Sequence, residues 1–123
     1  MPRRRVMSVA LACLFTAAGS AAAHAHAFLD HSEPAVGSTL VVPPTQVRIW
    51  FTEALEPAFS TITVTDAAGR SVGQGPAAVD GKDPMLLQIG LPSLPAGTYR
   101  VQWRVISVDT HPTEGDFTFT VKP

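Results

Sequence analysis

Apolar and polar residues alternate with a period of two in five segments of this 123-residue chain, and this pattern constrains the fold more than any other feature. In QVRIWF, residues 46–51, every second side chain is Val47, Ile49 or Phe51. Such alternation is typical of a β-strand that buries one face. The other four segments are 59–66, 86–91, 97–107 and 116–121. All five are predicted to be strands.

Proline and glycine separate these segments, for example at Pro43-Pro44, Gly75-Pro76 and Gly97. They supply the fixed or positive φ angles that turns need. No amphipathic helical window of useful length lies between them, and residues 70–84 are expected to form a long connection with one weak strand. Evenly spaced strands in a domain of this size predict an all-β antiparallel sandwich or barrel of about seven strands.

The first 25 residues have the layout of a secretory signal peptide. A basic stretch at residues 3–5 precedes an apolar run from Val6 to Ala18, and small residues follow it. The run is shorter than the roughly 20 residues that span a bilayer, and no later segment comes close, so no membrane insertion is expected. We therefore expect an exported protein from which the signal is removed.

Signal peptidase requires small residues at the last and third-from-last positions before the cut, and two registers meet this requirement. Cleavage after Ala21-Ala22-Ala23 gives a chain that begins with His24. Cleavage after Ala23-His24-Ala25 gives one that begins with His26. Both registers place a histidine at the new amino terminus.

The composition of the mature part restricts its partners. Cys13 lies in the signal, so residues 26–123 contain no cysteine, which excludes disulfides and thiolate chemistry. These 98 residues suffice for one domain. Six basic against ten acidic residues give a formal charge of −4 with histidine neutral. Nucleic acid is a poor candidate partner because phosphate binding needs a basic patch, and a cation is the more natural one.

Asp109 and His111 lie two residues apart near the carboxyl end. An extended backbone would point both side chains to the same side. Pro112 favours that conformation, because the residue before a proline is directed away from the helical region. A carboxylate and an imidazole are therefore expected to converge.

A free amino-terminal histidine can chelate one metal ion through its α-amine and its imidazole Nδ1, the arrangement called a histidine brace. The imidazole of His111 would add a third nitrogen and the carboxylate of Asp109 an oxygen. Such a set favours Cu(II), which also binds most tightly among the divalent ions of its row, and zinc is the alternative. Because the amine and both imidazoles must lose protons, affinity is expected to fall in acid.

Other side chains carry weaker signals. An Asp-x-His at a strand end is commonly a turn or a solvated pair, and His31 is expected at the surface. Glu53 ends a strand and faces water by default. Met85 is expected in packing or in a loop.

With these residues assembled, the chain resembles the CopC family of periplasmic copper-resistance proteins over nearly its whole mature length. The resemblance is carried by HAFLDHSEPAVGS from His26, VRIWFTEAL from Val47 and AGTYRVQWRVISVDTHPTEGDFTFTV from Ala96. Family members are similar in starting with a histidine eight residues before the first proline of an S-x-P-A-x-G-S-like stretch. Here that proline is Pro34. The resemblance therefore implies cleavage before His26.

The resemblance further implies an immunoglobulin-like, cupredoxin-resembling Greek-key β-sandwich in residues 26–123 that binds one Cu(II) at its amino-terminal end. In that case His26 supplies amine and imidazole, His111 a second imidazole and Asp109 a carboxylate. Glu53 would lie near the amine as a supporting partner or weak ligand.

Two departures bear on this expectation. Phe28 stands where many relatives have a second histidine, and Met85 is the one methionine left in the mature chain from a loop that holds Cu(I) in some relatives. Cu(I) needs several soft ligands. A member that binds only Cu(II) is therefore expected.

The expected function is that of a monomeric periplasmic copper-binding protein, not an enzyme. It would act in copper resistance, sequester Cu(II), or pass the ion to an inner-membrane copper transporter of the CopD type. One rival is an oxidative enzyme, since lytic polysaccharide monooxygenases also use an amino-terminal histidine brace. Another is a metal-free β module for adhesion or assembly. Oxygen consumption with a reductant distinguishes the first rival, and titration with Cu(II) the second.

Overall fold

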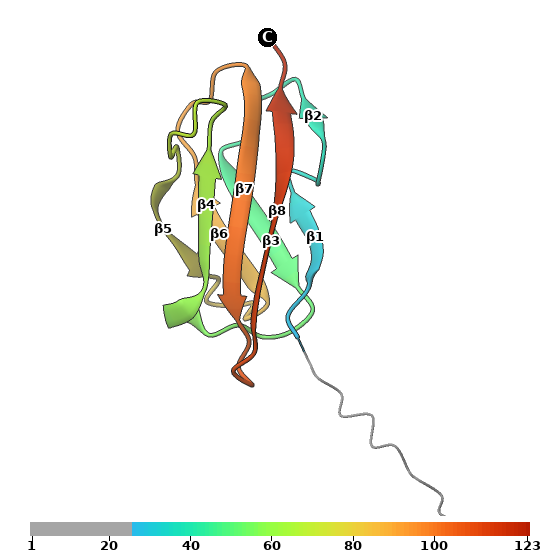
Figure 1. Ribbon diagram of the computed structural model, residues 1–123, viewed down its shortest axis with the longest axis vertical. Coiled ribbons are helices and arrows are strands. Elements are labelled where there is room, and N and C mark those ends of the chain that lie inside the picture. Colours follow the sequence, from blue (N-terminus) through green and yellow to red (C-terminus); the bar gives the residue numbers. More distant parts are fainter. Residues whose placement is uncertain (1–25) are drawn as a thin grey trace, which may run out of the picture.

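Two four-stranded β-sheets pack face to face in residues 26–123, the part of the chain that the computed structural model describes (Figure 1). The predicted signal peptide, residues 1–25, lies outside the described residues. Among residues 26–123, no helix is long and apolar enough to cross a membrane.

Each sheet takes strands from distant parts of the sequence. The first sheet has the order β1 (Leu29–Glu33), β3 (Gln46–Phe51), β6 (Leu86–Gly90) and β5 (Gln74–Val79). The second has the order β2 (Thr39–Leu40), β8 (Pro112–Val121), β7 (Gly97–Ile106) and β4 (Thr61–Thr65). A short 3₁₀ turn, η1 (Pro57–Phe59), precedes β4. All paired strands are antiparallel except β2 and β8, which are parallel.

The alternating apolar residues form the core between the sheets. On β3 the side chains of Val47, Ile49 and Phe51 are buried, whereas the residues between them are half-buried or exposed. β7 shows the same alternation over ten residues. Burying one face of each sheet against the other removes the apolar side chains from water. This burial stabilises the fold by about 25 cal/mol for each Å² of apolar surface. The all-β sandwich predicted from the sequence is confirmed.

Residues 26–123 form eight strands rather than about seven, and the differences have simple causes. β1 was not expected, because Ser32 is its one buried residue and its sequence shows no alternation. β2 has two residues, too few for any pattern. β8 begins at Pro112, four residues before the predicted strand, because its first half is polar and pairs with β7 through the backbone. The weak strand expected in residues 70–84 is β5.

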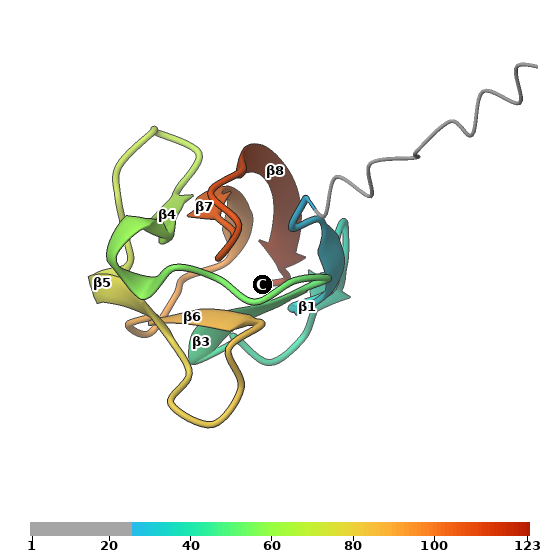
Figure 2. The same cartoon turned by 90° about the horizontal axis from the view of Figure 1, so that it is seen from below.

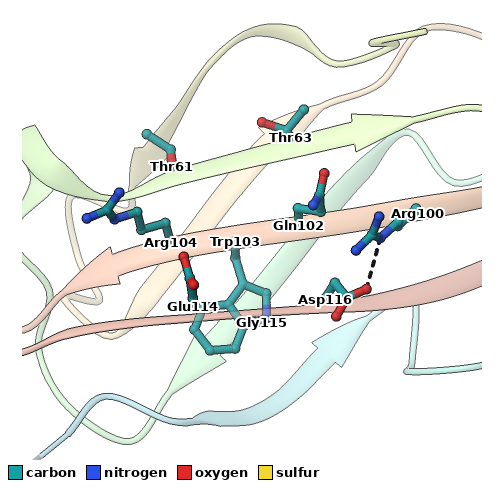
Figure 3. A pocket seen from close by; sticks show the side chains of 9 residues that line it. All are labelled: Thr61, Thr63, Arg100, Gln102, Trp103, Arg104, Glu114, Gly115 and Asp116. Atoms are coloured by element: carbon teal, nitrogen blue, oxygen red, sulfur yellow. Dashed lines mark hydrogen bonds and ion pairs between the residues drawn. The ribbon is translucent and has the colours of Figure 1, made fainter. Parts of the chain in front are cut away.

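Gly115 on β8 makes room for the largest side chain of the core. It faces Trp103 on β7, and a Cβ atom added at Gly115 would lie 2.5 Å from the indole Cζ2. Figure 3 shows the indole alongside β8 at this position. The absence of a side chain at Gly115 thus lets the indole pack against the strand.

The start of the described chain and the turn between β7 and β8 lie at the same end of the sandwich (Figure 1). Seen from below in Figure 2, the segment between β3 and η1 crosses this end. Backbone hydrogen bonds fix the crossing: Glu56 N donates to the Ile106 oxygen and Val108 N to the Ala54 oxygen. Three separate stretches of sequence therefore meet at one end of the fold.

We predict that Gly115→Ala destabilises the protein by about 1–3 kcal/mol, because the added methyl forces the indole of Trp103 or the backbone to move. Gly81→Ala is the matched control: nothing lies within 4 Å of a Cβ added there, so a change within about 0.5 kcal/mol is expected. Urea unfolding of the two variants measures the difference. Equal midpoints would show that the Gly115–Trp103 contact does not limit side-chain size.

Candidate metal centre

A tight turn carries Asp109 and His111 at the end of the β7–β8 hairpin. Thr110 N donates a hydrogen bond to the Ser107 oxygen, and Ser107 N donates to the His111 oxygen. Thr110 has a φ of 70°, in the left-handed region that a β-branched residue rarely adopts. This is the pattern of a three-residue hairpin loop, in which the last loop residue is left-handed. The extended backbone predicted for residues 109–111 is therefore wrong.

Asp109 and His111 nevertheless converge, because the turn folds the chain back between them. His111 Nδ1 lies 3.4 Å from Asp109 Oδ1. The two side chains are 39% and 40% exposed, so both are partly open to solvent, although the Nδ1 atom of His111 itself is buried. The predicted convergence of the two side chains is thus found, although the backbone between them is a turn and not an extended strand.

Ser107 is fully buried and holds the carboxylate in place. Its hydroxyl donates a hydrogen bond to Asp109 Oδ1. This bond lowers the pKa of the Asp109 carboxyl below its ordinary value; burial acts in the opposite direction, and the neighbouring His111 lowers it further. Asp109 is thus kept as an anion, the form that binds a cation.

Residues 26–28 are attached to the body of the protein by two threonine hydroxyls. Thr52 Oγ1 donates to the His26 oxygen at 3.2 Å and accepts from Phe28 N at 3.0 Å. Thr113 Oγ1, on β8, donates to the Ala27 oxygen at 2.6 Å. The Ala27 side chain is fully buried in the core. His26 is therefore the residue next to a firmly anchored one.

This attachment brings His26 beside His111. Their ring centroids are 4.9 Å apart and the rings meet edge to face. The ring of Phe28 also lies near that of His26, with the two ring centroids 5.9 Å apart. Of the three residues predicted as ligands, His26 and Asp109 thus each lie beside His111, at one end of the sandwich. Within residues 26–123 no group of three or more histidine, cysteine, aspartate or glutamate side chains is arranged so that it could hold a metal ion.

The remaining candidate residues lie in different surroundings. Glu53 follows Thr52 directly and is half-buried on the crossing segment. His31 lies on β1, where its ring stacks on Trp50 at 4.4 Å and its Nδ1 is 2.6 Å from Asp30 Oδ2. Met85, which is 41% exposed, accepts a backbone bond from Phe51 at the end of β3.

Sequence reasoning missed Ser107, Thr52 and Thr113. None of them carries a metal-ligand signal, because a hydroxyl that fixes a ligand follows no spacing rule. Thr113 alone carries a signal in the sequence, because it is a polar residue at a position that faces the core. Phe117 and Val121 occupy equivalent positions on β8.

A separate hollow of ≈ 550 Å³ lies on the outer face of β4, β7 and β8 (Figure 3). Threonine, arginine and acidic side chains line it, among them Arg100 and Asp116, which form an ion pair at 2.9 Å. It contains no histidine, and its charged groups are exposed. Its chemistry is that of a solvated sheet face, so the histidine cluster remains the candidate site.

The donor set of the cluster fits a borderline metal ion better than a hard one. Two imidazoles and one carboxylate suit Cu(II) or Zn(II), whereas Ca²⁺ and Mg²⁺ require oxygen ligands. In the full chain the nitrogen of His26 is a peptide amide, since Ala25 precedes it. Cleavage before His26 would turn that amide into an amine, which is a fourth donor.

Comparison with known proteins agrees with the resemblance noted in the sequence. Residues 29–122 match the CopC domain. The protein YobA of Escherichia coli K12 is 36% identical over 119 residues, with 96% of each chain covered. The copper resistance protein C of Escherichia coli is 42% identical over 81% of this chain and 84% of that protein. The copper transport protein CutJ of Bacillus subtilis is 32% identical over 79% of this chain, which corresponds to 18% of CutJ.

Solved structures show the same fold. The crystal structure of CopC from Methylosinus trichosporium OB3b matches with a TM-score of 0.75 and 35% identity, covering 80% of this chain and 95% of that one. PcoC from Escherichia coli, described as a methionine-rich copper resistance protein, matches with a TM-score of 0.64 and 39% identity, covering 80% and 100%. From its sequence and its fold, the chain belongs to the CopC family.

Proposed function

We propose that this protein is an exported copper-binding protein of the periplasm, which carries one Cu(II) per chain in a histidine brace at its amino terminus. The observation that carries the proposal is the approach of the His26 and His111 rings to 4.9 Å, with Asp109 beside His111. These residues come from opposite ends of the mature sequence and meet through the fold. The names of the copper resistance relatives support copper as the metal.

The proposal includes removal of residues 1–25 as a signal peptide. Of the two cleavage registers, the packing of residues 26–28 favours the cut before His26. Ala27 is fully buried and the carbonyls of residues 26 and 27 accept hydrogen bonds, so the backbone at His26 is already held against the body of the protein. A chain that began at His24 would carry its amine two residues, up to about 7 Å, beyond His26.

In the proposed site each residue has one role. The α-amine and imidazole of His26 and the imidazole of His111 supply three nitrogens, and the Asp109 carboxylate supplies an oxygen. A tetragonal set of nitrogen and oxygen donors is typical of Cu(II). Glu53 lies next to Thr52, which binds the His26 carbonyl, and we assign it a supporting position near the amine.

The ion is cargo in this proposal, and the protein is a carrier rather than an enzyme. It acts in copper resistance or sequestration, or hands Cu(II) to an inner-membrane copper transporter of the CopD type. The similarity to part of the longer copper transport protein CutJ supports a role beside a transport unit. We assign the carrier as a monomer, because one chain supplies all the proposed ligands.

Replacing the second imidazole tests the site directly. We predict that His111→Ala weakens Cu(II) binding by at least about tenfold, because one nitrogen ligand is lost. His31→Ala is the matched control, since His31 stacks on Trp50 and pairs with Asp30; its affinity is expected to stay the same. Competition titration of Cu(II) against a chelator measures both. A larger effect for His31→Ala would refute the ligand assignment, and no stoichiometric binding by the wild type would refute the proposed function.

Removing the Ser107 hydroxyl should raise the pKa of Asp109 toward its ordinary value of 3.8. A depressed folded-state pKa contributes stability above the unfolded value, and this contribution is lost as pH falls through the folded value. In the metal-free protein, Ser107→Ala should therefore lose less folding stability than the wild type when the pH falls below about 3.8.

Carboxyl NMR titration of Asp109 measures this change. Asp66 is an internal control, because its own pKa is lowered chiefly by the backbone N–H of Arg70 and is expected to stay unchanged. An unaltered Asp109 pKa in Ser107→Ala would contradict the role given to the hydroxyl.

A further inference from the structure

We propose that Thr52 and Thr113 are positioning residues that hold the amino-terminal histidine in place before the metal arrives. This inference rests on the proposed copper site and deepens it, because neither threonine is a ligand. Each acts on the backbone of residues 26–28, the segment that presents the brace.

The hydroxyl of Thr52 makes two bonds to this segment. It donates to the His26 oxygen and accepts from Phe28 N, while the Thr52 backbone N–H donates to the Phe28 oxygen at 2.9 Å. One residue thus satisfies groups on both sides of Ala27. A hydroxyl is needed for this, because it is both a donor and an acceptor.

The hydroxyl of Thr113 supplies the remaining bond. It donates to the Ala27 oxygen at 2.6 Å from β8, two residues beyond His111. The strand that carries the second imidazole therefore also holds the residue next to His26. This hydrogen bond links the two halves of the proposed site.

Thr113 occupies a position that the strand pattern assigns to the core. Its side chain is on the same face of β8 as Phe117 and Phe119, and it is paired with the fully buried Val105 of β7. A valine would fit the alternation without leaving a hydroxyl to satisfy. The threonine is accounted for by its bond to Ala27.

Chain termini are poorly ordered unless they are tied down, and ordering a flexible segment on binding lowers affinity. Here the three carbonyls of residues 26–28 accept hydrogen bonds and the Ala27 side chain is buried. The position of His26 is therefore fixed by the fold. Cu(II) then binds without the cost of ordering the backbone that carries its first two donors.

Isosteric replacement of Thr113 separates positioning from packing. Thr113→Val removes the hydroxyl and keeps the shape, and we expect a three- to tenfold loss of Cu(II) affinity, which is about the worth of one hydrogen bond. Thr113→Ser keeps the hydroxyl and should restore affinity. Thr120→Val is the matched control on the same strand: it removes a hydroxyl bonded to Thr98, far from the brace, and should leave affinity unchanged.

Electron paramagnetic resonance supplies a readout that a purely structural role would not move. The spectra of the wild type and of Thr120→Val should each show a single Cu(II) species. The spectrum of Thr113→Val should show a second species as well, because its amine becomes mobile. Thr52→Val should show the same change and a faster hydrogen exchange of the Phe28 amide in the metal-free protein, and it carries the test if Thr113→Val does not fold.

The possible failures are distinct. If the wild type binds Cu(II) tightly while Thr113→Val and Thr52→Val match it in affinity and spectrum, the positioning role is wrong and the copper site stands. If Thr113→Val loses stability only, as measured by urea unfolding, the threonine serves packing. If the wild type does not bind Cu(II), the proposed function itself fails.

Discussion

The hydrogen bond from Thr113 to the Ala27 carbonyl, together with the burial of Ala27, is the contact on which the candidate site depends. It joins the first described residues to β8, which also carries His111 through the adjoining turn. Together with the bonds from Thr52, it holds the backbone of residues 26–28 where the ring of His26 lies 4.9 Å from that of His111. The sandwich provides the rigid frame, because both attachment points lie on strands or directly after one.

The same architecture brings the residues of the proposed copper site to one end of the sandwich. Strand β3 leads into the crossing segment with Thr52 and Glu53, and the β7–β8 hairpin presents Asp109 and His111 at the same end. Ser107 lowers the pKa of Asp109, so the turn offers an anion next to an imidazole. A cut before His26 would create an amine next to backbone that the fold already holds through the hydrogen bonds of residues 26–28. Export and metal binding are linked in this account, since the proteolytic step creates the ligand.

The sequence was sufficient for those parts of the fold that follow a repeating physical rule. β3 and β7 were predicted because alternate side chains enter the core, whereas β1 was not, because Ser32 is its one buried residue and its sequence does not alternate. At the site, the chemistry of His26, Asp109 and His111 was visible, but the left-handed Thr110 was not, since a threonine gives no sign of that conformation. The roles of Thr52 and Thr113 appeared with the structure, because their partners are backbone carbonyls distant in sequence.

The central claim is that the fold holds a free amine at His26 for Cu(II). The most direct measurement compares the Cu(II) affinity of a protein that begins at His26, verified by intact mass, with that of the same protein carrying one additional glycine before His26. The added residue turns the amine into an amide and leaves every side chain in place. The account predicts that affinity falls by orders of magnitude in the extended protein. Equal affinity of the two proteins would contradict it.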